Sequence, residues 1–300
     1  MKTFKATIWP LLPALLLSLA ACRRHGERLT FTHEVLLPMT PVKDQGHTQL
    51  CWAYAMLATI ETEHLLRGDS VNLSPQYIGR MLPDYQKPFL TAHNSPRGDA
   101  AADRGPDRHA TLPSLRSPTQ RALCQTLLNM LDRYGVVGYD VMPDDAPPTL
   151  TPPRHVFMLG ARYTPTEFAH SVCAPGEYVG LTTIADSPYY RKIDVPIPDN
   201  WEHNRLLNMP KNELRRLVNR TLRSRHPVCW ESRDHAMAIV GMARDQHGRA
   251  YYVLKNSWGA DRPYGGLVYM PPRQLWRDVA AVYLPLPPFS VAPPSSPPEK

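Results

Sequence analysis

The residues best suited to chemistry are a cysteine, a histidine and an asparagine, which follow one another along the chain. Cys51 stands at the first turn of an apolar-periodic run that predicts a helix. A thiol at that place lies beside the positive end of the helix dipole, which favours the reactive thiolate. His235 begins a second apolar run, and Asn256 follows the end of a third. Together they could supply a nucleophile, a base and a group that orients the base.

Each of these residues also has a purely structural interpretation. A free cysteine is often simply buried, a histidine can belong to a core, and an asparagine often ends a strand. Gln45, six residues before Cys51, could donate an amide hydrogen bond over the sulfur, or it could cap a loop. Trp258 could shield a bond between Asn256 and His235, or it could be core. The presence of all these residue types together favours the catalytic interpretation.

Three short motifs carry these residues: QGHTQLCWAY around Cys51, DHA around His235, and NSWG from Asn256 onward. In this order and spacing they resemble the papain-like cysteine peptidases, and in outline the chain resembles the bleomycin hydrolase and aminopeptidase C branch. The resemblance covers about residues 38–285, closely only in the catalytic blocks. It implies an α+β fold of two lobes, in which a helical lobe with a central cysteine helix packs on an antiparallel sheet or barrel.

The same resemblance implies hydrolysis of peptide bonds through a thioester on Cys51. His235 would take the thiol proton to give a thiolate–imidazolium pair, and Asn256 would hold the imidazole in its tautomer and plane. The Gln45 amide and the Cys51 backbone N–H would stabilise the oxyanion. This chemistry needs no cofactor and no metal, and its partner is a peptide or protein substrate. Two alternatives stay open: a catalytically dead peptide-binding module, and an acyltransferase that uses the same triad.

Helices in the first half of the chain must position Cys51. Gly68 is expected to end the Cys51 helix, and Ser74 to cap a second helix that begins at the following proline. Residues 117–120 have the pattern of a capping box before a third helix, which Gly135 would end. Residues 84–116 are rich in Pro, Asp, Arg, Gly and His, and they predict a long insertion.

Strands in the second half must position His235 and Asn256. The sequence predicts a capping box at 164–167, a helix at 209–225, and strands at 227–230, 234–243, 250–255 and 265–270. The two central strands would form a hairpin. Such a hairpin sets His235 at the start of one strand and Asn256 at the end of its partner, so the two side chains can meet.

One departure from the resemblance concerns the substrate cleft. Papain-like enzymes begin one helix with a glycine pair that lines the cleft, and here those places fall near Arg121 and Ala122. Side chains at both places predict that the backbone does not pair with substrate in the usual way. This departure concerns how substrate binds and leaves the chemistry unchanged.

Charge and cysteine content exclude some classes of function. The formal net charge of +7 is spread thinly, without Lys/Arg runs interleaved with aromatics, so nucleic acid is not an expected partner. The sequence has no paired CxxC framework, and His93 and His109 lie in the polar insertion, so no metal site is expected. Cys124, Cys173 and Cys229 allow one disulfide, whose pairing the sequence leaves open.

The N-terminal residues resemble a bacterial lipoprotein signal. Lys2 and Lys5 precede a short, proline-broken apolar stretch that ends in Leu-Ala-Ala before Cys22. We therefore expect lipidation of Cys22, export, and anchoring to a membrane at the periplasmic face or the cell surface. The alternative is an ordinary cleaved signal with a chance cysteine.

These observations divide the chain into four parts, with one catalytic unit in two lobes. The parts are a signal peptide at 1–21, a lipidated tether at 22–40, a peptidase domain at 41–283 (helical lobe about 50–150, strand lobe about 155–283) and a Pro-rich disordered tail at 284–300. The sequence leaves open whether cleavage occurs within peptides or at their ends.

Overall fold

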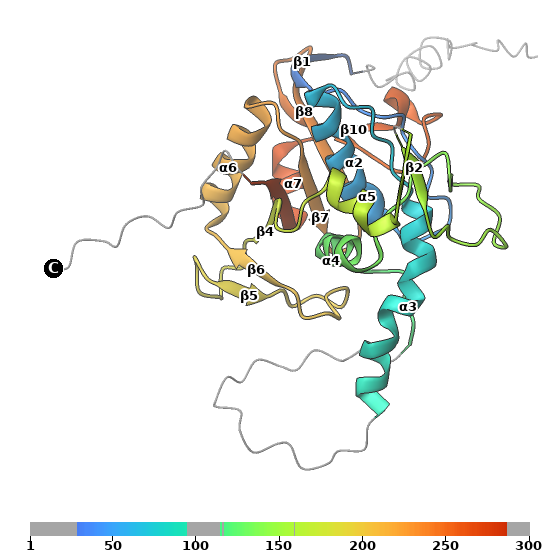
Figure 1. The fold of residues 1–300 in the computed structure, drawn as a ribbon. Coiled ribbons are helices and arrows are strands. Elements are labelled where there is room, and N and C mark those ends of the chain that lie inside the picture. The colour runs from blue at the N-terminus through green and yellow to red at the C-terminus, as the bar shows by residue number, and fades with distance from the viewer. Residues whose placement is uncertain (1–28, 95–114, 116, 159, 287–300) are drawn as a thin grey trace, which may run out of the picture.

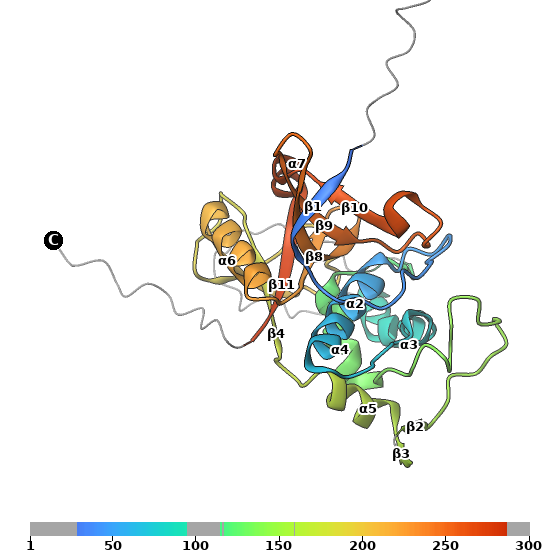
Figure 2. The same cartoon turned by 90° about the horizontal axis from the view of Figure 1, so that it is seen from above.

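The computed structural model describes residues 29–94, 115, 117–158 and 160–286 (Figure 1). The expected signal peptide, Cys22 and the chain beyond residue 286 lie outside these ranges, as does His109. The described residues form the expected α+β fold of two lobes. Figure 2 shows helices α2 to α5 gathered on one side of the molecule, and the large sheet with α6 and α7 on the other.

The helical lobe surrounds one central helix. Its helices are α2 (Cys51–Arg67), α3 (Pro75–Asn94), α4 (Cys124–Tyr134) and α5 (Pro165–Val172). In α2 every residue from Trp52 to His64 is buried, so neighbours cover this helix on all sides. Gly68 ends α2 in the left-handed conformation with φ 91°, as predicted, because glycine has no Cβ to oppose it.

Two of the other helix starts were predicted correctly. Ser74 Oγ accepts a hydrogen bond from the Tyr77 backbone N–H at 3.1 Å, which confirms the cap of α3. Thr164 and Glu167 make both hydrogen bonds of the expected capping box at the start of α5.

The start of helix α4 and the beginning of the expected insertion at 84–116 were predicted wrongly. Helix α4 begins at Cys124 without a side-chain cap, and not within 117–120. The reason is that the Gln120 side chain accepts from the Gln49 N–H, and Thr119 Oγ1 accepts from the Arg121 N–H, so neither caps a helix. Helix α3 continues to Asn94, so residues 84–94 are helical and do not belong to a loop. The side chain of His93 lies outside the described part.

The strand lobe is one sheet with the order β10-β9-β8-β7-β11-β4-β6-β5, to which β1 adds by pairing with β8. Its strands are β1 (Phe31–Leu36), β4 (Tyr178–Thr182), β5 (Lys192–Asp194), β6 (Arg205–Asn208), β7 (Val228–Ser232), β8 (Ala236–Asp245), β9 (Ala250–Lys255), β10 (Leu267–Met270) and β11 (Val279–Pro285). Every pair is antiparallel except β4 with β6.

Smaller elements complete the described part of the chain. They are α6 (Lys211–Arg223), α7 (Pro272–Asp278), a 3₁₀ turn η1 (Pro263–Gly266), and a separate two-stranded sheet of β2 (Val156–Met158) and β3 (Ala161–Tyr163). Helix α6 confirms the helix predicted at 209–225.

The predicted hairpin is confirmed as β8 and β9. Ala238 of β8 stands opposite Lys255 of β9. His235 therefore lies directly before one strand and Asn256 directly after the other, at the same end of the hairpin.

Two of the domain boundaries expected from the sequence differ from those in the structure. Phe31–Leu36, placed in the tether, pairs with β8 as strand β1. Leu284 and Pro285, placed in the tail, belong to β11, which lies between β4 and β7. The sheet thus begins earlier and ends later than the expected strand lobe.

A buried carboxylate holds α2 against its neighbours. Glu61 is 0% exposed and accepts hydrogen bonds from Lys43 Nζ, Thr40 Oγ1 and the Leu73 backbone N–H. Lys255 Nζ lies 3.8 Å from Glu61 Oε2. Burial lowers the pKa of Lys255 to about 8, while Glu61 acts in the opposite direction.

This buried charge cluster connects the three segments that carry the candidate site. Lys43 lies two residues before Gln45, Glu61 belongs to the Cys51 helix, and Lys255 directly precedes Asn256. Since a buried carboxylate needs its partners, the cluster fixes these segments relative to one another.

Candidate active site

Cys51 is the first residue of α2, at the junction of the lobes. Its N-cap, Leu50, contributes no side-chain hydrogen bond, and the Leu50 backbone carbonyl accepts from the N–H groups of Ala53 and Tyr54. The thiol is partly buried and lines a cavity of about 210 Å³. His235 and Gln45 line the same cavity, which brings three of the predicted site residues together.

His235 is held by Asn256. Its Nε2 lies 2.7 Å from Asn256 Oδ1, and the Ser257 backbone N–H donates to the same oxygen at 2.8 Å. The backbone donor identifies that atom as the oxygen of the amide, so His235 Nε2 must carry a proton. The other ring nitrogen, Nδ1, is then the basic one.

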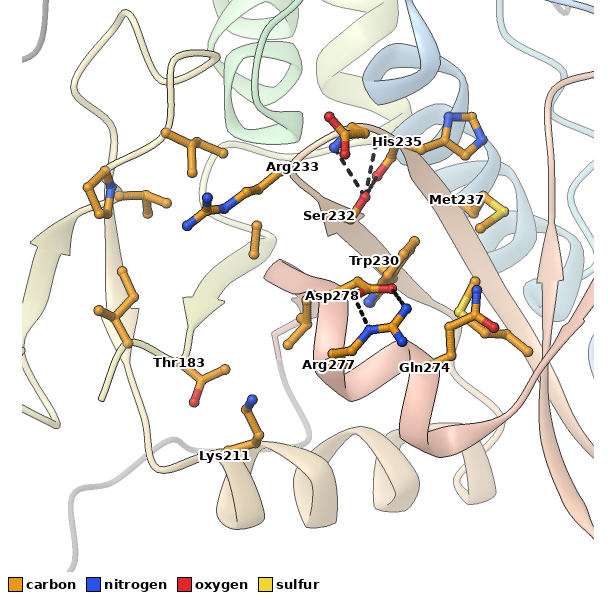
Figure 3. Close-up of a pocket in the computed structure, with 18 residues that line it drawn as sticks. Thr183, Lys211, Trp230, Ser232, Arg233, His235, Met237, Gln274, Arg277 and Asp278 are labelled. Atoms are coloured by element: carbon orange, nitrogen blue, oxygen red, sulfur yellow. Dashed lines mark hydrogen bonds and ion pairs between the residues drawn. The ribbon is translucent and has the colours of Figure 1, made fainter. Parts of the chain in front are cut away.

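The turn between β7 and β8 presents this histidine to the cavity. Ser232 Oγ accepts hydrogen bonds from the backbone N–H groups of Asp234 and His235, at 3.3 and 3.0 Å (Figure 3). A serine that bonds the backbone two and three residues ahead stabilises such a turn locally.

Trp258 covers the histidine from one side. Its ring stacks on the imidazole with centroids 5.1 Å apart and an angle of 30° between the planes. The tryptophan is 49% exposed, so it shields the imidazole without itself belonging to the core.

Gln45 is fixed at both ends of its amide. Its Nε2 donates to the Thr48 carbonyl at 2.7 Å, and its Oε1 accepts from Ser257 Oγ at 2.6 Å. An amide nitrogen has two hydrogens, so one remains to donate into the cavity. Ser257 directly follows Asn256. The same short segment therefore holds the Gln45 amide and positions His235.

Burial sets the charges of the thiol and the imidazole. It raises the pKa of Cys51 to about 11, although hydrogen bonds from the Ala236 and Trp52 backbones act in the opposite direction. It also lowers the pKa of His235, although the bond to Asn256 acts to raise it. The raised pKa of the thiol and the lowered pKa of the imidazole both favour the uncharged forms at rest, in contrast to the expected thiolate–imidazolium pair.

Arg121 occupies the place where a cleft glycine was expected. Its guanidinium binds Asp199 through Nε and Nη2, at 2.9 and 2.8 Å, and it lines the cavity. Its backbone N–H donates to Thr119 Oγ1 and its carbonyl accepts from Trp201 Nε1. The backbone of Arg121 is therefore already paired within the chain.

Glu231 is a cavity residue that the sequence did not indicate as functional. It is 4% exposed and accepts from the Cys124 N–H at 3.2 Å and the Tyr283 hydroxyl at 3.2 Å. Burial raises its pKa to about 8. The signal that could have found it is a glutamate within the apolar strand pattern PVCWES.

A larger cavity of about 660 Å³ adjoins this one (Figure 3). The two share Ser232, Asp234 and His235. Its other walls include the basic side chains Lys211 and Arg233. Among the described residues, no group of three His, Cys, Asp or Glu side chains could hold a metal ion.

Comparisons with known proteins concern the fold. No family model matches the chain. The solved structure of PepW from Lactobacillus rhamnosis is similar with a TM-score of 0.64 and 16% identity, over 92% of this chain and 89% of that chain. The chain has a papain-like two-lobe fold.

Two further proteins are less similar to this chain. A structure from work on the mite allergens Blo t 1 and Der p 1 has a TM-score of 0.48 and 17% identity, covering 83% of this chain and 67% of that one. Fruit bromelain of Ananas comosus is 40% identical over 42 residues, which span 14% of this chain and 12% of the bromelain.

Within the papain-like fold, the structure gathers the predicted residues around one cavity. Cys51, His235 and Gln45 line it, Asn256 holds His235, and Trp258 covers the imidazole. The lipidation site lies outside the described part, and the resemblance to the bleomycin hydrolase branch stays a prediction.

Proposed function

We propose that this protein is a cysteine peptidase that hydrolyses peptide bonds through a thioester on Cys51. The observation that carries the proposal is the 2.7 Å bond from His235 to Asn256, made at the wall of the cavity that Cys51 lines. A module that only binds peptides has no need of an amide that sets the tautomer of this histidine. The substrate is accordingly a peptide or protein.

The reaction begins with proton transfer from the thiol. Because burial favours the uncharged pair, Cys51 gives its proton to His235 Nδ1 as the sulfur attacks the scissile carbonyl. The oxyanion forms beside the Gln45 amide and the Cys51 backbone N–H. The imidazolium then protonates the leaving amine, which departs and leaves a thioester.

Hydrolysis of the thioester restores the enzyme. His235 takes a proton from water as the water oxygen attacks the acyl carbon. The carboxylic acid leaves, and the proton returns to the Cys51 sulfur. Asn256 keeps the ring in its plane through both halves of the reaction.

We also propose that the protein acts outside the cytoplasm, anchored to a membrane by lipid on Cys22. The support is the sequence pattern Leu-Ala-Ala-Cys after an apolar stretch. None of the described helices is long and apolar enough to cross a membrane. Retention of the exported protein in the membrane fraction, lost in a Cys22→Ser variant, would test the anchor.

Labelling with an epoxysuccinyl inhibitor tests the peptidase directly. The inhibitor should stop hydrolysis of a casein substrate and add to the tryptic peptide 44–67, which contains Cys51 and no other cysteine. A Cys51→Ala variant should take up no label on that peptide. Hydrolysis that continues with Cys51 fully labelled would refute the assignment, and hydrolysis absent from the start would favour the binding module.

An added acceptor separates hydrolase from acyltransferase. We expect the free acid as the product of peptide cleavage even when an amino acid amide is present. If most of the acyl group instead appears on the added amine, the same triad serves a transferase.

Gln45 gives a prediction for the oxyanion. Gln45→Ala should lower kcat by about 10²- to 10³-fold, because one preorganised donor is lost. Gln49→Ala is the matched control, since this exposed glutamine lines the same cavity, and it should leave kcat nearly unchanged. Equal losses in both variants would remove Gln45 from the oxyanion site.

The pH profile gives a further prediction. Protonation of His235 removes the base, and burial shifts its pKa below the ordinary 6.5. The acid limb of kcat/KM should therefore lie below pH 6.5. An acid limb at or above that value, measured with a substrate that does not titrate there, would contradict the buried imidazole as the base.

A further inference from the structure

We propose that Cys124 and Cys229 form a disulfide that joins the two lobes beneath the candidate active site. Their sulfurs lie 3.4 Å apart, and both residues are 0% exposed. Cys124 is the first residue of α4 in the helical lobe, whereas Cys229 lies in β7 of the sheet. This inference does not depend on the proposed activity.

The geometry selects one of the pairings that the sequence left open. A disulfide has an S–S length of about 2.05 Å, so the two sulfurs need to approach by only about 1.4 Å. Both side chains belong to the same buried core. Cys173 sits at the end of α5, and Cys51 lines the cavity.

The bond forms by exchange with an external disulfide such as glutathione disulfide. One thiolate attacks that disulfide and releases one glutathione, and the second thiolate displaces the other, so two thiols become one disulfide as two glutathiones are formed. Burial raises the pKa of Cys124 well above its ordinary value, and no oxidant reaches a thiol at 0% exposure. Oxidation therefore belongs to folding, before the two lobes close.

The crosslink would fix two walls of the cavity. The Cys124 backbone N–H donates to Glu231, which lies two residues beyond Cys229 and lines the cavity with Ala122. The bond also closes a loop between residues 105 positions apart. A loop of that length restricts the unfolded chain strongly, so oxidation should raise Tm by about 10 °C.

Tryptic mapping tests the pairing. Full-length protein is refolded in a glutathione redox buffer, its circular dichroism is checked, free thiols are alkylated, and the chain is digested without reduction. Trypsin separates each candidate: peptide 122–133 contains Cys124, 226–233 contains Cys229, 163–191 contains Cys173, and 44–67 contains Cys51. We expect a linked pair of 122–133 with 226–233 that separates on reduction.

Two variants complete the design. Cys173→Ala is the matched control, and it should keep the linked pair and the rise in Tm on oxidation. Cys229→Ala should lose both, with Cys124 still too buried to be alkylated in the native state. Folded wild-type protein in which 122–133 and 226–233 are both alkylated after denaturation, or in which either is linked to another cysteine, would overturn the proposal.

Discussion

Replacing Cys51 with alanine is expected to lower kcat/KM for peptide hydrolysis by about 10⁴-fold or more. In the proposed mechanism the Cys51 sulfur is the protein atom that bonds to the substrate, so its loss removes the nucleophile. The substitution removes one sulfur at a cavity wall, so the thermal unfolding curve should hardly move. The measurement is steady-state hydrolysis with thermal unfolding of the same preparation.

Cys173→Ala provides the comparison for this variant. Cys173 is 5% exposed at the end of α5, outside the cavity, so its loss should affect stability more than hydrolysis. Substantial hydrolysis by the Cys51→Ala protein, after contaminating peptidases are excluded with a separate purification, would show that another residue is the nucleophile.

Glu61→Gln is expected to destabilise the fold by about 3–5 kcal/mol. The substitution removes the charge that faces Lys43 and Lys255, and it leaves two buried ammonium groups near one another. Removing one partner of a buried pair costs far more than the pair itself contributes. The measurement is the free energy of unfolding by urea.

Glu63→Gln is the matched variant on the same helix. Glu63 is 4% exposed, but its neighbours His226 and Arg67 are more exposed to water. Glu63→Gln should therefore lower the free energy of unfolding clearly less than Glu61→Gln does. If the two variants lose the same stability, Glu61 does not hold the segments of the site together in the way described.

The hairpin that brings His235 to Asn256 could be predicted from the sequence because its signals are local. Alternating hydrophobicity indicates the strands, and the turn between them fixes which ends meet. The capping box at 164–167 was also local and was confirmed. The similar pattern at 117–120 failed, because Gln120 and Thr119 bond elsewhere.

Partners that lie far apart in the chain and outside the catalytic motifs could not be predicted. Arg121 and Asp199 are 78 positions apart, and no local pattern connects a guanidinium with a distant carboxylate. The close approach of the Cys124 and Cys229 sulfurs, from residues 105 positions apart, is likewise not signalled by any local pattern. Strand β1 was missed because most of its residues are exposed, which removes the alternation that indicates a strand.

The protonation state of the site also depends on the fold. A thiol at a helix N-terminus favours the thiolate in the sequence argument, since the helix dipole is positive there. In the structure the same thiol is partly buried, and desolvation raises its pKa more than the backbone hydrogen bonds from Ala236 and Trp52 lower it. The electrostatics thus follow from burial, which the local sequence does not contain.

Trapping the acyl-enzyme tests the central claim most directly. A peptide active ester is mixed with the protein, the reaction is quenched in acid after milliseconds, and the tryptic digest is searched for the acyl mass. We expect the acyl group on Cys51 in peptide 44–67, and far slower acylation of a His235→Ala variant. An acyl group on any other residue, or product formed while Cys51 stays unmodified, would contradict it.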